Sequence, residues 1–540
     1  MRDELCDFVI VGAGSAGCVL ASRLSERGAR VVLLEAGPRD SNPLIHMPGG
    51  LARLAHFTSI NWNYETEPEP ALDMRRLYWP RGRVLGGCSS INAMCYTRGA
   101  AADYDEWVAL GATGWSYADV LPYFRLSERQ ARGPSPYHGA DGPLSVEDLR
   151  YRNPLSSLFV DAAVEAGFPR TADFNGPDPD GFGFYQVTQL RGRRSSAATA
   201  YLHPVRPRRN LDVRTGCHAV RIAFEGDRAV GVVVATRGTE RVVRADVEVI
   251  LAAGAIGSPH LLLLSGVGPA ADIEAHGIRV HADLPGVGQN LQDHLDFTTL
   301  QECRRPVTYD FGLLEEVAVA LRYLLTRSGP GVTNAAEAGG FARSRFASDA
   351  RPDLQFHFVP AQIDDHGRQR RAGHGYTLHA CHLRPRSRGR ITLRSARSQD
   401  PPRIFAGYGS DPYDIGVLVE GVQRSRQILN ATPFDGWRGR EVYPGDSVRT
   451  ESDIEAAIRR RAQTLYHPVG TCRMGTDALA VTDPHLRVHG IRGLRVADAS
   501  IMPRLIGGNT NAPTIMIAER AARLIADEHD GAVRSGSEAR

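Results

Sequence analysis

The segment DFVIVGAGSAGCVLASRLSERGARVVLLEAG near the start of the chain limits the possible folds more than any other feature. Residues 7–11 are a short apolar run typical of a buried parallel strand. Gly12, Gly14 and Gly17 follow as G-x-G-x-x-G, a spacing that permits a tight turn and a close approach of the backbone to a pyrophosphate. About twenty residues further on, Glu35 ends a second strand, where an acid can bind ribose hydroxyls. The segment therefore predicts a dinucleotide-binding strand–helix–strand unit.

Two later segments extend the same sheet. The stretch DVEVILAAGAIGSPHLLLLSGVGP predicts a strand over 247–251 and a helix beginning near Ser258, and LRVADAS predicts a third strand that ends at Asp498. Between these pieces lie long irregular segments, whereas a compact nicotinamide enzyme would continue with regular alternation of strands and helices. A sheet assembled from three distant pieces favours a cofactor that lies extended through the protein, as FAD does.

Composition excludes several functions. At 540 residues the chain is too long for one ordinary core, so two or more domains are expected. The apolar fraction of 42% and charged fraction of 23% are typical of a soluble globular protein, and a net charge of +3 gives no reason to expect a nucleic-acid partner. All 64 basic residues are arginine, which excludes a Schiff-base lysine and a Walker-type lysine.

Cysteine usage and the N-terminus bear on the compartment. The 8 cysteines are scattered without a Cys-x-x-Cys pair, which favours a reducing compartment and argues against a disulfide framework. The chain runs directly into its first strand without a signal-like leader, and LLLLSGVG is too short to span a bilayer. We therefore expect a cytoplasmic protein, with peripheral contact to the inner face of the cell membrane left open.

Five stretches together resemble one family. They are the N-terminal glycine turn, GRVLGGCSSINAMCYTRG, GAIGSPHLLLLSGVGP, HPVGTCRMG and RVADASIMPRLIGGNTNAPTIMIAER, and in this order they resemble the glucose–methanol–choline (GMC) oxidoreductases along essentially the whole chain. Stretches such as EAGPRDSNPLIHMP, DLPGVGQNLQDHLD and LQFHFVP are most similar to the bacterial branch that contains FAD-dependent medium-chain alkanol and choline dehydrogenases.

The resemblance implies a set of FAD contacts. The glycine turn would hold the pyrophosphate, Glu35 the adenosine ribose, and residues 92–95 the isoalloxazine ring. Some relatives attach the flavin covalently through a histidine whose position is Ile91 here, and since Ile91 has no nucleophile we expect non-covalent FAD. The expected cofactor-binding residues are Gly12, Gly14, Ser15, Ala16, Gly17, Glu35, Ala36, Val84, Asn92, Ala93, Met94, Cys95, Val220, Asp498, Ala499 and Asn509.

His467, in TLYHPVGTCRMG, is the candidate catalytic base. A zinc site would need more Cys or His neighbours than Cys472, so no metal is expected, and a lone histidine before proline is in isolation more often structural. In the family the matching histidine faces flavin N5, and imidazole titrates in the range needed to accept a hydroxyl proton. The resemblance implies that Asn511 faces His467 across the substrate oxygen and donates a hydrogen bond to it.

The C-terminal stretch NTNAPTIMIAERAARLIADEH predicts a helix that opens at Asn511 with Pro513 in its first turn. Its positive dipole end would stabilise negative charge on reduced flavin. Alternatively, it is an ordinary amphipathic core helix whose preceding asparagines only cap it.

Other polar residues have weaker claims to a role. Glu337 either offers a carboxylate to a cationic substrate such as choline or is structural, and we favour the structural role. LQFHFVP and YTLHACHL predict strands of an antiparallel sheet, with Phe356 or Phe358 either walling the pocket or lying in the core. The histidines expected to be structural or on the surface are His203, His281, His294, His357 and His382.

These inferences combine into an α/β fold, α+β overall. We expect a discontinuous Rossmann-like FAD-binding domain (1–155, 196–300 and 460–528), a substrate domain with an antiparallel sheet flanked by helices (156–195 and 301–459), and a disordered tail (529–540). The resemblance implies oxidation of primary, aliphatic alcohols to aldehydes, with hydride transfer to flavin N5 and electrons passed to a quinone-type acceptor, which could be a membrane quinone. The alternatives are a choline dehydrogenase, an oxidase that uses O2, and a hydroxynitrile-lyase-like enzyme that contains FAD. Homo-oligomerisation stays open.

Overall fold

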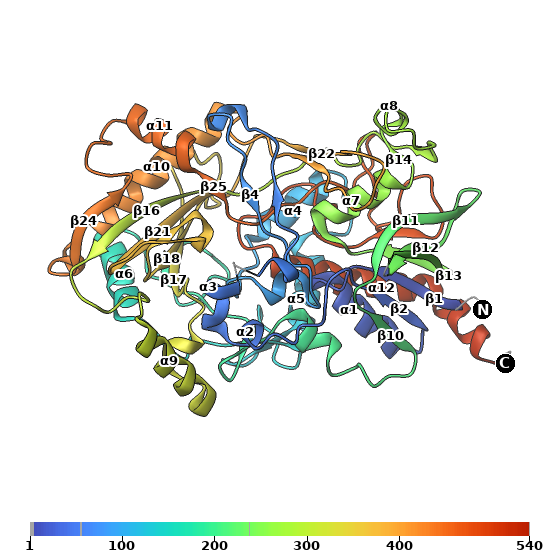
Figure 1. Ribbon diagram of the computed structural model, residues 1–540, viewed down its shortest axis with the longest axis horizontal. Coiled ribbons are helices and arrows are strands. Elements are labelled where there is room, and N and C mark those ends of the chain that lie inside the picture. Colours follow the sequence, from blue (N-terminus) through green and yellow to red (C-terminus); the bar gives the residue numbers. More distant parts are fainter. Residues whose placement is uncertain (1–4, 55–56, 237, 539–540) are drawn as a thin grey trace.

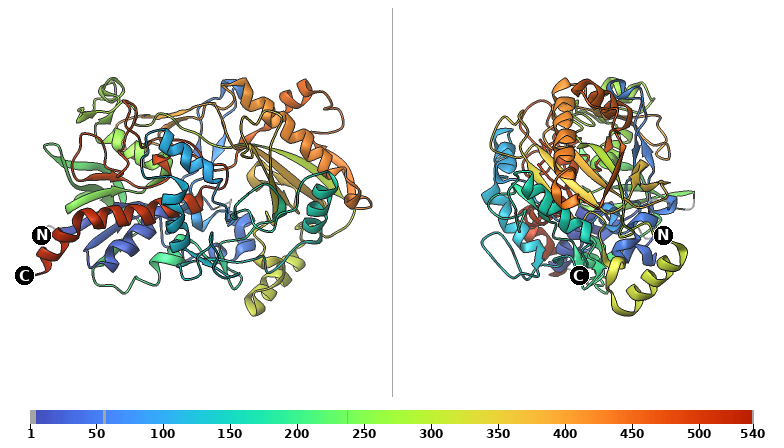
Figure 2. Two further views of the ribbon diagram at one scale, coloured as in Figure 1. Left: turned by 180° about the vertical axis from the view of Figure 1, so that it is seen from behind. Right: turned by 90° about the vertical axis from the view of Figure 1, so that its left-hand side faces the viewer.

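A computed structural model describes residues 5–54, 57–236 and 238–538. Two large sheets lie at opposite ends of an elongated molecule, and β1 and the end of helix α12 lie together at one end (Figure 1). Figure 2 shows from behind that α12 runs along the first sheet towards the centre of the molecule. None of the helices in the described part of the chain combines the length and apolar content that a membrane crossing requires.

The described residues form a first sheet of seven strands in the order β10-β2-β1-β13-β12-β11, with β26 beside β13. The pairs β10–β2, β2–β1, β1–β13 and β13–β26 are parallel, as expected for a Rossmann-like unit. All four residues of β2 are buried, which explains its continuous apolar run. The bounds are β1 (Leu5–Val11), β2 (Val31–Leu34), β10 (Leu211–Arg214), β11 (His218–Glu225), β12 (Arg228–Thr236), β13 (Thr239–Leu251) and β26 (Leu494–Val496).

Three helices connect this sheet to the site: α1 (Ser15–Glu26), α7 (Gly254–Leu264) and α12 (Asn511–Glu538). Helix α7 begins at Gly254, earlier than the expected start near Ser258, because the Asp498 carboxylate accepts the Gly254 N–H at 2.8 Å and so caps the helix. Helix α12 begins at Asn511 as expected. It continues to Glu538, so 529–538, which we expected to be disordered, are helical, while 539–540 lie outside the described residues.

The described part of the chain forms a second sheet of seven strands, order β24-β16-β21-β18-β17-β7, with β25 beside β16. Its strands are antiparallel, and the expected pairing of LQFHFVP with YTLHACHL is confirmed by the register Phe356↔Ala380. Phe356 and Phe358 are fully buried, and Phe358 stacks on Phe159 with ring centroids 4.8 Å apart, so both belong to the core. The bounds are β7 (Gly181–Phe184), β16 (Leu295–Cys303), β17 (Ala338–Ala342), β18 (Leu354–Val359), β21 (Gly375–His382), β24 (Arg438–Tyr443) and β25 (Gln463–Thr464).

The remaining helices surround the two sheets, and α6 and α10 pack on the second one. Strand β16 spans the expected domain boundary at 300/301. The limits of the two domains stay a prediction. These helices are α2 (Pro43–His46), α3 (Leu51–Leu54), α4 (Ala101–Ala109), α5 (Tyr117–Ser127), α6 (Pro154–Glu165), α8 (Ala270–Glu274), α9 (Leu313–Thr326), α10 (Pro412–Leu429) and α11 (Glu451–Arg461). The short strands are β3 (Tyr64–Glu65), β4 (Tyr78–Trp79), β5 (Glu128–Gln130), β6 (Leu144–Val146), β8 (Gln189–Leu190), β9 (Arg193–Arg194), β14 (Val267–Gly268), β15 (Ala282–Asp283), β19 (Ile363–Asp364), β20 (Gln369–Arg370), β22 (Arg390–Thr392) and β23 (Arg403–Phe405).

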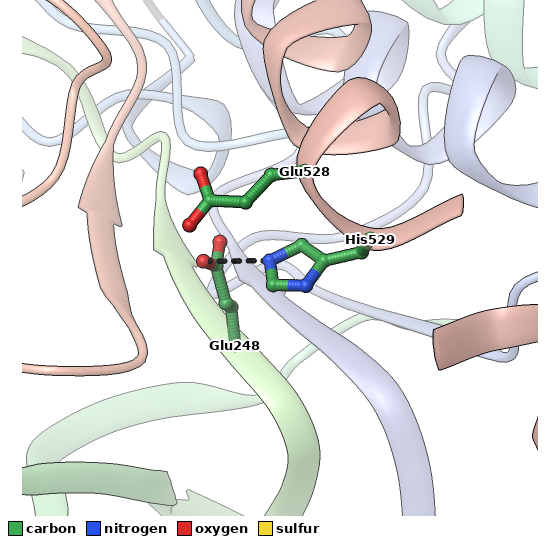
Figure 3. Close-up of side chains that lie close together, drawn as sticks. All are labelled: Glu248, Glu528 and His529. Carbon is green, nitrogen blue, oxygen red and sulfur yellow. Dashed lines mark hydrogen bonds and ion pairs between the residues drawn. The ribbon is translucent and has the colours of Figure 1, made fainter. Parts of the chain in front are cut away.

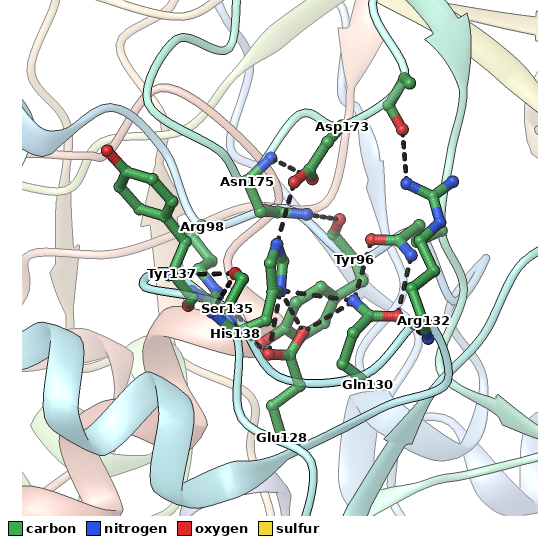
Figure 4. Close-up of polar contacts among 12 residues, drawn as sticks. Tyr96, Arg98, Glu128, Gln130, Arg132, Ser135, Tyr137, His138, Asp173 and Asn175 are labelled. Carbon is green, nitrogen blue, oxygen red and sulfur yellow. Dashed lines mark hydrogen bonds and ion pairs between the residues drawn. The ribbon is translucent and has the colours of Figure 1, made fainter.

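A buried charged network joins the segment after the expected flavin contacts to the loop that contains Asp173 (Figure 4). Glu128 is fully buried and accepts hydrogen bonds from Arg98 at 2.7 Å and from His138 Nδ1 at 2.9 Å. The other ring nitrogen of His138 bonds Asp173 at 2.9 Å. Burial acts to lower the pKa of His138, but the hydrogen bonds with Asp173 and Glu128 outweigh it and raise the pKa to about 9. The doubly bonded imidazole is therefore a cationic bridge at neutral pH.

Candidate active site

The backbone around His467 is fixed by a buried carboxylate. Asp293 accepts the His467 N–H at 2.7 Å and the Thr464 hydroxyl at 2.5 Å, and it also accepts the hydroxyl of Tyr408. Burial raises the pKa of Asp293 to about 6 despite these hydrogen bonds. Tyr466, immediately before the histidine, has a φ of +73°, an uncommon conformation for a residue with a side chain. This clamp explains how a segment without helical or strand periodicity presents one imidazole in a defined place.

Hydrogen-bond partners assign the tautomer of His467. Its Nδ1 lies 2.9 Å from Nδ1 of His294, whose Nε2 lies 3.2 Å from the carbonyl oxygen of Leu383. A carbonyl only accepts, so His294 Nε2 carries the hydrogen and His294 Nδ1 is the acceptor. Nδ1 of His467 must then donate, which leaves a lone pair on His467 Nε2. The arrangement points the basic nitrogen away from His294 and towards Asn509.

The carboxamide that faces this nitrogen belongs to Asn509, whose Nδ2 lies 3.2 Å from His467 Nε2. The Asn509 oxygen accepts hydrogen bonds from Thr97 and Gln355, each at 3.0 Å, so its amide group cannot turn round without losing both. Asn511, which we expected at this place, accepts instead from the Ser15 hydroxyl at 2.7 Å. The structure thus replaces Asn511 by Asn509 as the neighbour of His467.

The different partners of the two asparagines have a geometric reason. Asn509 lies in the loop before α12, where its backbone N–H donates to Thr97 at 2.8 Å and its side chain is held beside the imidazole. Asn511 is the first residue of α12, and its side chain turns back to the start of α1. The structure therefore brings Asn509, and not Asn511, within hydrogen-bond distance of His467, while the expected contacts of the two asparagines with flavin and substrate stay predictions.

Burial keeps the imidazole of His467 neutral. Desolvation, followed by the neighbouring His294 and His357, holds the pKa of His467 well below its ordinary value. Burial likewise lowers the pKa values of His294 and His357 to about 3. A neutral imidazole with an unprotonated Nε2 is the form that can accept a proton.

The geometry of the glycine turn fits the expected pyrophosphate cradle. A Cβ on Gly17 would lie 1.8 Å from the carbonyl oxygen of Gly12, and Gly12 has a φ of +99°. A Cβ on Gly14 would meet nothing nearer than the Cα of Gly87, at 3.9 Å. Helix α1 has neither a side-chain cap nor an acidic residue in its first turn, so its N-terminal amides are available to an anion. These features fit a dinucleotide phosphate.

The remaining expected cofactor residues fall into two groups. Beside the turn, Glu35 accepts the N–H groups of Ala13 at 3.0 Å and Gly37 at 2.8 Å, and burial raises the pKa of Glu35 to about 7. The backbone N–H of Cys217 donates to the Glu35 carbonyl at 2.9 Å. This contact brings the start of β11, which contains Val220, close to Glu35. The residues of the glycine-turn group are Ser15, Ala16, Ala36, Val220, Asp498 and Ala499.

The second group lies near His467. Residues 92–95 precede Thr97, which bonds Asn509, and Asn334 donates to the carbonyl of Ala93 at 3.0 Å. Val84 is fully buried in a cluster with Ile45. Asn92, Ala93, Met94 and Cys95 thus lead into the segment that contacts Asn509 beside the imidazole, and their expected contact with the isoalloxazine ring stays a prediction.

Sequence reasoning missed Arg194. It is buried, it donates to the carbonyl of Ile45 at 2.8 Å and to the carbonyl of Asn92 at 2.6 Å, and its Nη2 has no hydrogen-bond partner among the described residues. Burial lowers the pKa of Arg194 to about 9. An arginine in a run of arginines gives no local signal of burial, so a single sequence could not have distinguished it. His294, which we expected to be structural or on the surface, was also missed as a neighbour of His467.

Glu337 is fully engaged within the protein. It is fully buried and accepts hydrogen bonds from the Asn153 N–H at 2.7 Å, from Ser156 at 2.8 Å and from Thr333 at 2.6 Å, as well as from the Tyr309 hydroxyl. Both carboxylate oxygens of Glu337 thus accept hydrogen bonds from donors of the protein itself. The contacts favour the structural role over a site for a cationic substrate.

One cluster in the described part of the chain could geometrically hold a metal: Glu248, Glu528 and His529 (Figure 3). His529 Nε2 lies 3.0 Å from Glu248, as the dashed line in the figure marks. Arg495, fully buried, bonds Glu248 at 2.7 Å and also bonds Glu528. Because this guanidinium already pairs with both carboxylates, the cluster ties α12 to β13 and β26.

A glycine turn that fits a dinucleotide phosphate at a helix N-terminus, together with a neutral imidazole beside an oriented carboxamide, is typical of a dinucleotide-dependent oxidoreductase. The chain belongs to the GMC oxidoreductase family, whose N-terminal model matches residues 6–296 and whose C-terminal model matches residues 385–518.

Known proteins of the family are similar over nearly the whole chain. A Pseudomonas putida alcohol dehydrogenase (acceptor) is 50% identical over 531 residues, which cover 97% of this chain and 96% of that protein. Mitochondrial choline dehydrogenase of Homo sapiens is 47% identical over 536 residues, covering 97% and 90%. The crystal structure of pyridoxine 4-oxidase from Mesorbium loti superposes with a TM-score of 0.88 at 34% identity, covering 96% of this chain and 98% of that one.

Proposed function

We propose that this protein is an FAD-dependent alcohol dehydrogenase that oxidises primary aliphatic alcohols to aldehydes and passes the electrons to a quinone-type acceptor. The observation that carries the proposal is the lone pair on His467 Nε2 with the Asn509 amide 3.2 Å away. The similarity to an alcohol dehydrogenase that uses an acceptor supports the same reaction and acceptor class.

His467 and Asn509 have different roles toward the alcohol. His467 Nε2 accepts the hydroxyl proton, and Asn509 Nδ2 donates a hydrogen bond to the oxygen on which negative charge develops. Thr97 and Gln355 keep the Asn509 amide in the donating orientation. FAD, when bound, supplies N5 as the acceptor of the hydride from the alcohol carbon. The protein residues thereby separate the proton from the hydride.

A neutral alcohol fits this site better than choline. Glu337, the one carboxylate singled out for a cationic substrate, is fully bonded to the chain. The principal alternative, choline oxidation, is supported by the choline dehydrogenase relatives. Anaerobic mixing of the FAD-loaded enzyme with short and long alkanols, benzyl alcohol and choline, followed by flavin absorbance, decides between them. Rapid bleaching by alkanols alone supports the proposal, whereas bleaching by choline alone contradicts it.

The acceptor needs a separate measurement. Turnover with alkanol under air should release little hydrogen peroxide and should accelerate when a soluble quinone is added. Stoichiometric peroxide release without a quinone would identify an oxidase. Absence of any bleaching, with FAD bound, would point to the lyase-like alternative.

We infer that FAD is held without a covalent bond, because Ile91 offers no nucleophile and is packed beside the cluster that contains Val84. Denaturation should release all the flavin into the supernatant, and flavin that stays with the precipitated protein would contradict the inference. We place the enzyme on the cytoplasmic side of the membrane. Its 8 unpaired cysteines, all but Cys88 buried, support a reducing compartment.

A further inference from the structure

Helix α9 (Leu313–Thr326) turns an apolar face to solvent. A surface helix ordinarily buries its apolar stripe, and single exposed leucines are common, but contiguous exposed apolar patches mark interaction sites. Among the described residues, thirteen large hydrophobic side chains are exposed, and six of them belong to this one helix. They are Leu313 (77% exposed), Leu314 (85%), Val317 (50%), Leu321 (54%), Leu324 (73%) and Leu325 (82%).

The helix is attached by its opposite face. Residues 314, 317, 321, 324 and 325 share one side at helical spacing, whereas Tyr323 points inward, is 9% exposed and donates its hydroxyl to the His46 carbonyl at 3.2 Å. Glu316 pairs with Arg53 on the neighbouring α3. Figures 1 and 2 agree that α9 projects from the edge of the molecule. The six exposed apolar residues thus form an outward ridge, and Tyr323 and Glu316 attach the opposite face of the helix to the protein.

Arginines accompany the ridge. Arg322 and Arg327 are exposed, one within α9 and one at its end. The guanidinium groups of Arg193 and Arg327 lie close enough to the Tyr323 ring to lower its pKa, although burial has the larger, opposite effect. The two acids of α9 lie in its first turn, where Glu315 accepts the Gly312 N–H and Glu316 pairs with Arg53, so the C-terminal half of the helix carries basic but no acidic charge.

We propose that α9 docks the protein onto a membrane surface, with its leucines entering the headgroup–acyl boundary and Arg193, Arg322 and Arg327 contacting lipid phosphates. An amphipathic helix with a leucine face and basic residues beside it has the properties of an interfacial membrane helix. The inference rests on the proposed function, in which a lipid-soluble quinone takes the electrons.

The chain that follows α9 leads to the site. Residues 329–332 form a short turn, and Asn334, directly beyond it, donates to the carbonyl of Ala93 in the expected isoalloxazine segment. Docking through α9 would therefore place the lipid surface on the side of the protein where this helix is joined, through residues 329–334, to the expected isoalloxazine segment. A membrane-dissolved acceptor and an apolar alcohol would both be concentrated there.

A second copy of the chain fits the ridge less well. A helix of 14 residues is about 21 Å long, and its outward strip falls well short of the roughly 800 Å² per partner that a stable interface buries. The six large apolar side chains of the ridge also carry no hydrogen-bonding group.

Flotation with lipid vesicles tests the proposal on the full-length, FAD-loaded protein. Vesicles contain phosphatidylethanolamine with phosphatidylglycerol, and a parallel set contains phosphatidylcholine alone. The variant Leu321→Glu/Leu325→Glu removes two leucines of the ridge. The matched control Leu126→Glu/Leu479→Glu changes two leucines with 49% and 48% exposure elsewhere on the surface.

The wild type and the control should float with the anionic vesicles, and Leu321→Glu/Leu325→Glu should bind at least about tenfold more weakly. Arg322→Gln/Arg327→Gln should lose about tenfold on anionic vesicles and little on phosphatidylcholine. All variants should keep alcohol-driven bleaching of the flavin, because none of the changed residues lies at His467.

Failure of the wild type to float, with bleaching intact, would overturn the docking proposal alone. Loss of a dimer in the glutamate variant, seen by light scattering together with unchanged flotation, would assign the ridge to a second copy and likewise overturn it. Flotation of a protein that alcohols do not bleach would overturn the proposed function instead.

Discussion

At the scale of single residues, the chemistry depends on which nitrogen of His467 carries the lone pair. The chain Leu383–His294–His467 has one consistent assignment of hydrogens, and it ends with an unprotonated Nε2 that faces the Asn509 amide. Thr97 and Gln355 fix the amide in the same sense. The protonation pattern that the reaction needs at its start is thus fixed by four side chains around His467, which are His294, Asn509, Thr97 and Gln355.

The pH dependence of alcohol oxidation follows from the lowered pKa of His467. Neutral imidazole is the active form, so activity is lost as the pH falls through the pKa of this residue, and a lowered pKa moves that loss to lower pH. Anaerobic flavin reduction by alkanol should therefore stay constant as the pH falls to 6.5, the ordinary value for histidine. A half-maximal rate at or above pH 6.5 in stopped-flow measurements would contradict the assignment.

The two asparagines can be separated by substitution. Asn509→Ala removes the hydrogen bond to the reacting oxygen and should slow flavin reduction by about 10²- to 10³-fold. Asn511→Ala removes the contact with Ser15 and should weaken FAD binding while leaving the reduction rate of the loaded enzyme near that of the wild type. The reverse pattern, with the rate lost only in Asn511→Ala, would restore the assignment made from the sequence.

His294 acts as a positioning residue. His294→Leu removes the acceptor for His467 Nδ1–H, which frees the tautomer and should slow reduction by about 10²-fold or more. Because His294 also helps to lower the pKa of His467, its loss should shift the acid limb of the pH profile upward. His294→Gln, which retains an acceptor oxygen, should recover part of the rate. A slower rate with an unshifted profile in both variants would indicate a merely structural role.

At the scale of elements, substitutions in the glycine turn can distinguish an effect on folding from an effect on FAD binding. A Cβ at Gly17 collides with the Gly12 carbonyl, so Gly17→Ala should destabilise the protein by about 3 kcal/mol. Gly14 is open on the protein side, so Gly14→Ala should fold normally but bind FAD at least about tenfold more weakly. Circular dichroism and flavin titration provide the two readouts, and tight FAD binding by Gly14→Ala would contradict the cradle.

The buried network around Glu128 predicts a large effect on stability. Glu128→Ala leaves Arg98 and His138 without their shared carboxylate and should lower the free energy of unfolding by about 3–5 kcal/mol. Asp148→Ala, which breaks a solvent-exposed pair with Arg132, is the control and should cost less than about 1 kcal/mol. Equal losses in denaturant unfolding would show that burial of the network does not matter.

At the scale of the whole molecule, the sequence predicted those parts that depend on local pattern. The strands around the glycine turn, the antiparallel pairing of β18 with β21 and the start of α12 at Asn511 all follow from periodicity or turn chemistry. The start of α7 was missed because its cap, Asp498, comes from a segment far along the chain. The contacts of His467 with Asn509 and with His294 depend on the packing of distant segments, which no local pattern encodes.

The central claim is that His467 removes the alcohol proton so that the hydride can leave. Its most direct test compares wild type and His467→Ala, both loaded with FAD, in anaerobic stopped-flow mixing with a primary alkanol. The account predicts rapid loss of flavin absorbance in the wild type, and a rate at least about 10²-fold lower in the variant at the same FAD content. Equal rates in the two proteins would contradict the account.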